Sequence, residues 1–522
     1  MGFFNLDVDF FKQNGEMTIP PVSPLVRENC FLGMEPESVP LPVFEQIKGR
    51  LPQPVWEGHP DHIACYWRTW ELAFGNLRTP LPSTGFVSNF IDTAFNGCIF
   101  MWDTVFILMY GKYADRIFRF QQTLDNFYSH QHRDGFICRE IEENTGKDHF
   151  TRHDPSATGP DVMAWCEWEY YLNFGDRERL ARVFPPLMAY HRWMAEHHTW
   201  PDGTYFSSGW GCGMDNLPRH MPGQSPHFSH GHMIWVDACM QELLSCHVLL
   251  EMARVLNRQE FTAELEAEQK RLEAVINEKL WDEKTGFYYD LWKTGQHNMV
   301  RHIGAFWALI AGCAPEDRAQ RLIAYLQDEG EFKSPHRVPA LSKSHPDYAP
   351  HGEYWAGGVW PPTNYMVLKG LDRYGYYDLA HEIGREHLDA VVEVFKKHNT
   401  VFENYAPEWI DEGKPAKGEP AKADFAGWSG LGPVSILFEY VFGIKPDAAR
   451  RKITWHVNLL EEHGIRQYPF GTEGELTLLC QARNHPGEKP QITLESNIPV
   501  TLEVIWGERE SRQSFTLSVP GK

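Results

Sequence analysis

The feature that most constrains the fold is a long series of helical segments that arrive in adjacent pairs. Apolar residues recur at three- and four-residue spacing, as in Leu244, Val248, Met252 and Val255, and this period indicates helices with one buried face. Short turns join the members of several pairs, while loops rich in Gly, Pro, Trp and Asp separate one pair from the next. Twelve helical segments are predicted, over residues 62–76, 98–113, 115–129, 160–173, 176–197, 233–256, 259–280, 300–313, 316–328, 362–375, 377–398 and 428–442.

Six helical hairpins with their long loops on one side predict a mainly α fold, an (α/α)6 toroid. In such a toroid six inner helices form a barrel, six outer helices surround it, and the long loops build a cleft at one end. Three parts are expected: an N-terminal arm packed on the barrel (residues 1–60), the toroid itself (61–445) and a small C-terminal antiparallel β-sandwich (446–522). The β-sandwich is predicted from short apolar segments, such as residues 453–457 and 476–480, between turn residues.

Net charge and cysteine spacing disfavour several classes of function. Lys and Arg number 49 against 70 Asp and Glu, a formal net charge of −21, so binding to nucleic acid or to an anionic membrane is disfavoured. No stretch approaches the ~20 apolar residues of a membrane span, and no secretory signal is apparent, so a cytoplasmic location is expected. The ten cysteines lack a CxxC pair, which is typical of reduced thiols. No pattern indicates an oligomeric state.

Residues 209–220 form a loop with three glycines and a proline, and one carboxylate, Asp215, lies between Met214 and Asn216. Glycine and proline favour a shaped loop over a helix or strand. Apolar and aromatic neighbours, such as Met214 and Trp210, raise the pKa of a carboxyl group, which a catalytic acid requires. The alternative is that Asp215 caps a turn, a common role for Asp.

Four further loops carry acidic and aromatic side chains. They contain Trp102-Asp103, Arg139-Glu140, Glu353-Tyr354-Trp355 with Trp360 and Asn364, and Glu403-Asn404-Tyr405. Each motif alone has an ordinary explanation, such as a helix cap, a surface ion pair or a packed turn. All of them fall between helical pairs, however, so we expect them on the same face of the toroid.

Taken in order, these five loops resemble glycoside hydrolase family 63. The matching residues are Trp102-Asp103, Asp134-Gly135-Phe136 with Arg139-Glu140, Gly213-Met214-Asp215-Asn216-Leu217-Pro218-Arg219, Glu353-Tyr354-Trp355 with Gly358-Val359-Trp360-Pro361-Pro362-Thr363-Asn364-Tyr365, and Glu403-Asn404-Tyr405-Ala406-Pro407. The resemblance covers about residues 60–445. The family includes processing α-glucosidases, bacterial α-glycosidases and hydrolases of glucosylglycerate and mannosylglycerate, and it is similar in fold to the trehalases. This chain departs from it at Ala356-Gly357, where members often have Arg-Gly.

The resemblance implies an inverting glycosidase with Asp215 as general acid and Glu403 as general base. Inversion needs an acid that protonates the leaving oxygen and a base that activates water on the opposite face of the sugar. Glu408 is an alternative base, but it lies outside the matched motif. Neither a cofactor nor a metal is expected. Sugar-binding residues are expected among Trp102, Asp103, Arg139, Trp210, Asn216, Tyr354, Trp360, Asn364 and Trp428.

The predicted function is therefore an inverting exo-α-glycosidase, with an α-glucoside as the favoured substrate, acting on a small glycoside or an oligosaccharide end. A trehalase-like or mannoside-directed hydrolase is the alternative. A sugar isomerase or epimerase on the same toroid would need histidines as acid and base, and the Asp and Glu loops argue against it. His381 and His387 are six residues apart and do not form an HExxH zinc helix. His227, His230 and His232 are interpreted as cleft or surface residues.

Overall fold

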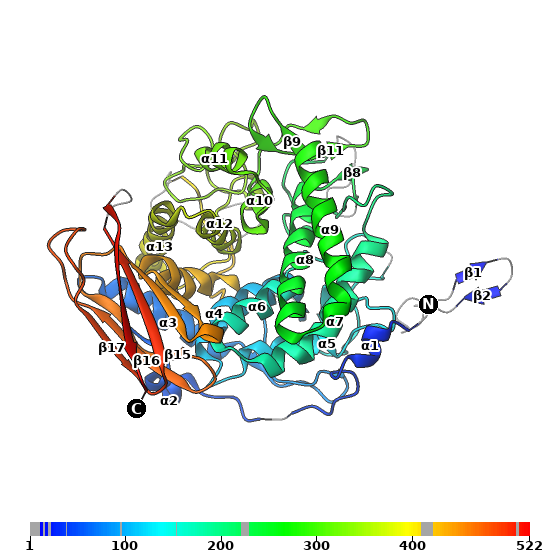
Figure 1. Ribbon diagram of the computed structural model, residues 1–522. Coiled ribbons are helices and arrows are strands. Elements are labelled where there is room, and N and C mark those ends of the chain that lie inside the picture. The colour runs from blue at the N-terminus through cyan, green and yellow to red at the C-terminus, as the bar shows by residue number, and fades with distance from the viewer. Residues whose placement is uncertain are drawn as a thin grey trace.

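The computed structural model describes residues 11–13, 16–18, 22–37, 39–93, 97–152, 154–220, 229–408, 421–507 and 511–521. The chain is helix-rich, with 43% of it helical, as the periodicity predicts. Figure 1 shows the helices in the centre and right of the molecule and the strands of the C-terminal region at its left. Within the described ranges, no helix is long and apolar enough to cross a membrane.

The helices of the main body follow the predicted segments closely. They are α3 (Pro60–Gly75), α4 (Met101–Gly111), α5 (Thr123–Tyr128), α6 (Met163–Phe174), α7 (Arg177–His197), α8 (Val236–Leu256), α9 (Thr262–Val275), α10 (Trp307–Ala311), α11 (Glu316–Tyr325), α12 (Pro361–Arg373) and α13 (Tyr377–His398). The last predicted segment is a 3-10 helix, η8 (Trp428–Leu431), that continues into a π-helix, η9 (Gly432–Val441). Two short helices, α1 (Pro24–Glu28) and α2 (Phe44–Ile47), precede α3.

Two predicted helices are much shorter in the structure. α5 occupies only the end of the segment 115–129, and α10 only part of 300–313. In the first case the Asp115 carboxylate accepts a hydrogen bond of 3.0 Å from the backbone N–H of Gln121. Such a side-chain bond competes with the helical backbone pattern, so the chain turns before α5 begins.

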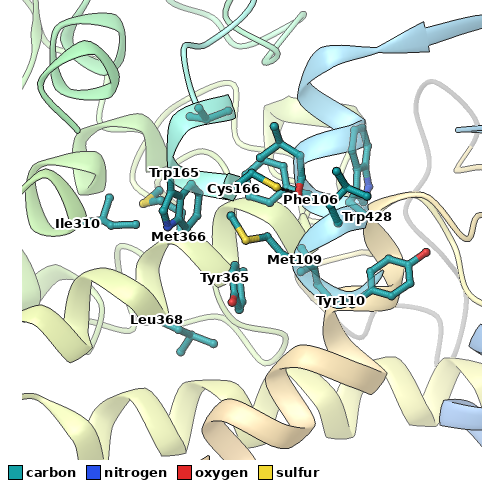
Figure 2. Close-up of a cluster of buried hydrophobic side chains, with 14 of the residues drawn as sticks. Phe106, Met109, Tyr110, Trp165, Cys166, Ile310, Tyr365, Met366, Leu368 and Trp428 are labelled. Atoms are coloured by element: carbon teal, nitrogen blue, oxygen red, sulfur yellow. Dashed lines mark hydrogen bonds between the residues drawn. The ribbon is translucent and has the colours of Figure 1, made fainter. Parts of the chain in front are cut away.

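A set of buried helices packs side by side around the centre of the molecule. Each helix contacts the next: α4 contacts α6, α6 contacts α8, α8 contacts α10, α10 contacts α12, and α12 contacts η8. η8 in turn contacts α4. Every residue of α4 is buried, as expected for a helix that is apolar on all sides. Side chains of these helices share one core, in which Trp165 and Tyr365 lie close together (Figure 2). The centre of the Trp165 ring is 5.9 Å from that of Trp307 and 6.2 Å from that of Tyr365.

Buried charges tie these helices together at the ends away from their N-termini. The Glu439 carboxylate on η9 lies 3.1 Å from Lys112 and 2.9 Å from Lys369, and it accepts hydrogen bonds of 2.8 Å from Tyr113 and Tyr365. Burial alone would raise the pKa of Glu439, but the ammonium groups of Lys112 and Lys369 hold it below its usual range. Because a buried charge is costly unless it is paired, this cluster fixes how the helices meet.

The C-terminal region forms two four-stranded sheets. One consists of β13 (Ile444–Asp447), β14 (Lys452–Val457), β18 (Val500–Trp506) and β19 (Gln513–Val519), and the other of β17 (Ile492–Ser496), β16 (Gly474–Cys480), β15 (His463–Phe470) and β3 (Gln53–Trp56). β16 and β18 alternate between buried and more exposed residues, which is the pattern of a half-buried strand. The strands predicted in this region are therefore confirmed.

Two features of these sheets differ from the sequence prediction. β14 and β18 pair in parallel, so the first sheet is mixed rather than purely antiparallel. In the second sheet β3 pairs with β15, with Trp56 opposite His463. β3 belongs to the segment predicted as an arm on the barrel, and instead it completes a sheet of the C-terminal region. The edge of a sheet presents backbone N–H and C=O groups that another strand can pair with.

Short strands elsewhere shape the loops between helices. They are β1 (Phe11–Gln13) with β2 (Glu16–Thr18), β4 (Leu77–Arg78) with β5 (Phe90–Ile91), β6 (Cys98–Phe100) with β7 (Glu140–Glu142), β9 (Trp281–Asp282) with β10 (Phe287–Tyr288), and β8 (Met233–Ile234) with β11 (Asp290–Trp292) and β12 (His297–Asn298).

Candidate active site

A cavity of about 250 Å³ lies at the N-terminal ends of α4, α6, α12 and η8. Its lining comes from the first turns of α4 and η8, from the loops before these helices and from the loop that carries Asp215. The lining residues are Phe100, Met101, Trp102, Asp103, Arg139, Glu140, His149, Phe150, Gly159, Pro160, Trp210, Gly211, Gly213, Asp215, Tyr354, Trp355, Glu403 and Trp428. The structure thus brings together eight residues predicted for the site, which are Asp215, Glu403, Trp102, Asp103, Arg139, Trp210, Tyr354 and Trp428.

Local backbone geometry directs Asp215 into the cavity. Gly213 has a φ of +75°, and a Cβ added to it would lie 3.4 Å from the Trp102 indole, so the turn suits glycine far better than a residue with a side chain. Asp215 follows two residues later and is partly exposed. The Trp210 ring at the start of the same loop lies 6.3 Å from Phe150. Asp215 is therefore placed beside aromatic walls.

A buried arginine anchors the C-terminal end of this loop. The Arg219 guanidinium donates hydrogen bonds of 2.7 and 2.9 Å to Asp237 and of 2.9 and 2.5 Å to Asp290. It also stacks over Trp235, with the guanidinium carbon 4.1 Å from the ring centre. Burial alone would lower the pKa of Arg219, but the two carboxylates raise it well above its usual range. Because Asp290 also accepts a hydrogen bond from the backbone of Val236, the loop is tied to the start of α8.

Glu403 enters the cavity from the loop before η8 and is 3% exposed. Its backbone carbonyl accepts a hydrogen bond of 2.7 Å from the Trp428 indole. Two residues further on, Tyr405 and Val359 exchange backbone hydrogen bonds of 2.8 and 3.0 Å. These contacts connect the Glu403 loop with the segment before α12 and with η8, so its backbone is held from both sides.

Strand pairing places Asp103 beside Glu140. Phe100 at the end of β6 lies opposite Glu140 on β7, and Asp103 follows in the first turn of α4, 4% exposed. Burial raises the pKa of the Asp103 carboxyl well above its usual range, and the charges of Glu403 and Glu140 raise it further. In the described part of the chain, Asp103 Oδ1 and Trp102 Nε1 are buried without a hydrogen-bond partner. Both are therefore available to a ligand hydroxyl group.

Arg139 is the one arginine or lysine in the described lining, and its charge is already engaged. Its Nη1 lies 2.5 Å from Glu140 Oε1, its Nε donates a hydrogen bond of 2.6 Å to the carbonyl of Ser156, and its guanidinium lies 4.6 Å from the centre of the Phe150 ring. Burial raises the pKa of Glu140, and Arg139 opposes that shift. With four carboxylates against one guanidinium, the lining carries a formal charge of 1 − 4 = −3.

Three residues predicted to bind sugar are absent from the lining and support it instead. Asn216 donates a hydrogen bond of 2.8 Å to the carbonyl of Glu353 and accepts one of 2.7 Å from the backbone N–H of Trp355. The Trp360 ring is fully buried and stacks on Trp355 at 3.9 Å. The Asn364 amide is also fully buried and donates to the carbonyl of Trp360 at 3.1 Å. These contacts fix the Tyr354–Trp355 wall.

The other sequence candidates lie away from this cavity. Glu408, the alternative base, pairs with Lys343 at 3.0 Å and is not in the lining. His230 and His232 are close to each other, with ring centres 4.6 Å apart, and they are also absent from the lining. His227 falls outside the described residues.

The structure adds lining residues that sequence reasoning did not assign. Glu140 could have been assigned to the site from the sequence, because it belongs to the same motif as Arg139. His149, Phe150, Gly159 and Pro160 belong to the long loop between β7 and α6, where no motif marks them. Cys98, Glu140 and His149 could together hold a metal ion by their spacing.

Comparison with known proteins identifies the family. The model of the mannosylglycerate hydrolase MGH1-like glycoside hydrolase domain matches residues 99–420, a range that contains all five loops of the cavity. The chain belongs to glycoside hydrolase family 63. It is therefore a glycoside hydrolase rather than a sugar isomerase or epimerase.

This family 63 chain is similar in sequence or structure to several named relatives. A mannosylglycerate hydrolase of Thermus thermophilus is 26% identical over 347 residues, covering 54% of this chain and 83% of the relative. A probable mannosyl-oligosaccharide glucosidase of Schizosaccharomyces pombe is 25% identical over 297 residues, covering 54% of this chain and 34% of the relative. The crystal structure of a family 63 mannosylglycerate hydrolase, also of Thermus thermophilus, in complex with glucose superposes with a TM-score of 0.56 at 23% identity, over 71% of this chain and 99% of the other.

Proposed function

We propose that the protein is an inverting exo-α-glycosidase, with Asp215 as general acid and Glu403 as general base. The observation that carries the proposal is the meeting of these two carboxylates in one cavity, although they are 403 − 215 = 188 residues apart. Family membership supplies the reaction class, and the cavity supplies residues suited to it. Its aromatic walls can pack against the apolar faces of a sugar ring.

In this mechanism Asp215 protonates the leaving glycosidic oxygen while Glu403 removes a proton from water on the opposite face of the ring. Water attacks the anomeric carbon as the bond to the leaving oxygen breaks, so an α-glycoside releases a β-sugar. Asp103 Oδ1 and Trp102 Nε1 would bind sugar hydroxyl groups. Arg139 would position the ring, because its guanidinium is fixed by Glu140 and Ser156.

We further propose an (α/α)6 toroid for residues 61–445, a C-terminal β-sandwich for residues 446–522, and a cytoplasmic location. The continuous contacts among α4, α6, α8, α10, α12 and η8 support the toroid, because six inner helices must close on themselves. The two four-stranded sheets support the sandwich. The segment 1–60 is proposed as an arm, with β3 joined to the sandwich.

The charge of the lining favours a neutral substrate, an α-glucoside at the end of a small glycoside or oligosaccharide. With Asp215 protonated as the acid, three carboxylates remain in the lining and Arg139 is paired with one of them, so an anionic aglycone would meet net repulsion. A mannoside-directed hydrolase is the second candidate, because the matching family model is that of mannosylglycerate hydrolases. A trehalase-like activity also fits a neutral disaccharide.

A glycoside panel tests the proposal. Maltose, kojibiose, nigerose, trehalose, glucosylglycerate and mannosylglycerate are incubated with the enzyme, and proton NMR records the first anomer released. Release of a β-sugar from an α-glycoside is expected, and release of the α-anomer would contradict inversion.

Single substitutions test the roles of the two carboxylates. Asp215→Asn and Glu403→Gln should each abolish turnover with an unchanged circular dichroism spectrum. Glu408→Gln is the matched control, since Glu408 lies outside the cavity, and it should remain active. Near-full activity of either of the first two variants would remove that residue from its proposed role.

A further inference from the structure

A second cluster of ionisable side chains lies directly behind the cavity wall. Asp161 follows Gly159 and Pro160, which line the cavity, and it meets His191 of α7 and Glu242 of α8. The three residues are 2%, 1% and 2% exposed, so the cluster is closed to solvent. The reaction proposed above makes no use of it, and a buried charged cluster is costly unless its charges are compensated.

The spacing around His191 Nδ1 is wide for ordinary ion pairs. Asp161 Oδ2 lies 3.4 Å and Glu242 Oε2 3.3 Å from this nitrogen, whereas charge-assisted hydrogen bonds are about 2.7–2.9 Å long. Ligand atoms at ~2.0–2.1 Å from a tetrahedral metal ion are separated from one another by roughly 3.3–3.4 Å. The two distances therefore match the edges of a coordination tetrahedron.

The other ring nitrogen is held as in many metal-binding histidines. Glu268 on α9 lies 3.2 Å from His191 Nε2, and it accepts hydrogen bonds of 2.8 Å from Tyr205 and 3.1 Å from Arg271. A carboxylate that accepts the Nε2 proton leaves the Nδ1 lone pair free to bind a metal, and such supporting carboxylates are typical of histidine-ligated metal ions. Cys246, the remaining candidate ligand on this side, donates to the carbonyl of Leu265 at 3.1 Å.

Two buried oxygens in the cluster have no hydrogen-bond partner in the described ranges. They are Glu242 Oε2 and the Tyr190 hydroxyl, and Tyr190 is fully buried. Burial raises the pKa of the Tyr190 phenol most, and the charges of Asp161 and Glu242 raise it further, so this hydroxyl lies in the field of the same two carboxylates that flank His191. Leaving buried polar atoms unpaired is unfavourable, and an ion bound to Glu242 Oε2 would satisfy that oxygen.

Charge balance also indicates a cation. Asp161, Glu242 and Glu268 contribute three negative charges and Arg271 one positive charge, which leaves −3 + 1 = −2 with His191 neutral. A single divalent ion neutralises this sum. In the metal-free alternative a protonated His191 leaves one negative charge, which a proton on Glu242 would neutralise, since burial raises the pKa of Glu242 to about 8.

We propose that His191 Nδ1, Asp161 and Glu242 bind a structural divalent metal ion of the Zn²⁺ type. The ion would join α7 and α8 to the loop before α6. The same loop holds Arg139 through the carbonyls of Ser156 and Ala157, at 2.6 and 2.9 Å. The site therefore braces the cavity wall without contacting the substrate. The alternative is a metal-free network in which an imidazolium at His191 lies among the three carboxylates.

Metal analysis of the whole protein distinguishes these two cases. The protein is stripped with EDTA, dialysed against Zn²⁺, Mn²⁺, Ca²⁺ or Mg²⁺ in separate arms, and assayed for bound metal by mass spectrometry and for its thermal midpoint. We expect one Zn²⁺ per chain and a higher Tm in the Zn²⁺ arm. Retention of Ca²⁺ or Mg²⁺ but not Zn²⁺ would overturn the assigned ion type, and no retained metal with no change of Tm in any arm would establish the metal-free network.

Variants locate the ion if it binds. Asp161→Asn and Glu242→Gln should lose bound Zn²⁺, and Glu268→Gln should weaken binding by about 10–100-fold. Glu273→Gln is the matched control, because Glu273 on the same helix as Glu268 pairs with a different histidine, His247, at 3.3 Å. As a readout that needs no variant, Co²⁺ is added to the stripped wild-type protein. Visible absorption bands of tetrahedral Co²⁺ are expected in this experiment. For the variants, full Zn²⁺ binding by Asp161→Asn and Glu242→Gln would overturn the assigned ligands.

Discussion

The anchor of the Asp215 loop gives a sharp test of how burial sets the strength of an ion pair. In the Arg219→Lys variant the planar guanidinium, which bonds Asp237 and Asp290 through four hydrogen bonds, is replaced by a single ammonium. The side chains of all three residues are at most 1% exposed. A lysine cannot reproduce the two-pronged contact with two carboxylates, so at least one buried carboxylate loses its partner.

The expected loss in the free energy of unfolding follows from this burial. Removing one partner of a buried pair destabilises a protein by about 3–5 kcal/mol, and the retained positive charge places Arg219→Lys near the lower end, about 3 kcal/mol. That is roughly a 100-fold change in the ratio of folded to unfolded protein. Because Asp215 stands four residues before Arg219, we also expect a lower kcat.

Arg192→Lys is the matched control. Arg192 makes three hydrogen bonds of 2.7–3.0 Å to Glu264, but both side chains are 43% exposed, and exposed pairs contribute about 1 kcal/mol or less. Urea unfolding is followed by tryptophan fluorescence and by circular dichroism, and coincident transitions justify a free energy. Equal losses in the two variants would refute burial as the source of the effect.

Two further predictions concern pH. Burial, and then the charges of Glu403 and Glu140, raise the pKa of Asp103 in the folded protein above the pKa of about 3.9 that Asp has in an unfolded chain. The folded protein therefore becomes less stable as pH rises above about 3.9, because the unfolded chain releases this proton more easily. Asp103→Asn should therefore be more stable than wild type at pH 7 but not at pH 3.5 in urea unfolding, and less active; equal stability at pH 7 would contradict this. Burial lowers the pKa of His463 to about 4, below its unfolded value of about 6.5, so stability should fall as pH falls through this interval, by up to about 3 kcal/mol. His463→Gln should reduce that slope and the exposed His485→Gln should not, and identical slopes for both would show that His463 is not responsible.

Helical periodicity and loop motifs account for much of what the sequence predicts. The segment 377–398 is α13 with the same bounds, because its apolar residues repeat at the helical period and Asn399 ends it in a left-handed conformation. The cavity could also be anticipated, since Asp215 and Glu403 stand in loops between helical pairs, and Trp102 and Asp103 begin a helix directly after such a loop.

Contacts between distant segments could not be read from local pattern. β3 carries no signal that it pairs with β15, some four hundred residues later, because the partner of an edge strand is set by tertiary packing. Glu140 joins the lining through the pairing of β6 and β7, which only the fold reveals. Likewise, Asp161, His191 and Glu242 come from three elements with no shared spacing, so their meeting has no sequence motif.

The pairing of Arg139 with Glu140 leads to a final prediction about substrate choice. In this chain the guanidinium lies 2.5 Å from the Glu140 carboxylate, so its charge is cancelled within the lining. Glu140→Gln removes that cancellation and changes the formal charge of the lining from −3 to −2. Two unit charges 4 Å apart interact by about 1–4 kcal/mol, depending on the effective dielectric constant, so binding of an anionic ligand should improve by at least about fivefold.

The measurement is competitive inhibition by D-glycerate and by neutral glycerol during hydrolysis of the best neutral glycoside from the panel. The inhibition constant of glycerate should fall in Glu140→Gln, while that of glycerol stays constant. Glu408→Gln removes a carboxylate outside the cavity and should change neither constant. If glycerate inhibits wild type and Glu140→Gln equally, the charge of the lining does not control the choice of aglycone. The proposed preference for a neutral substrate would then have to come from the shape of the cavity formed by its aromatic walls.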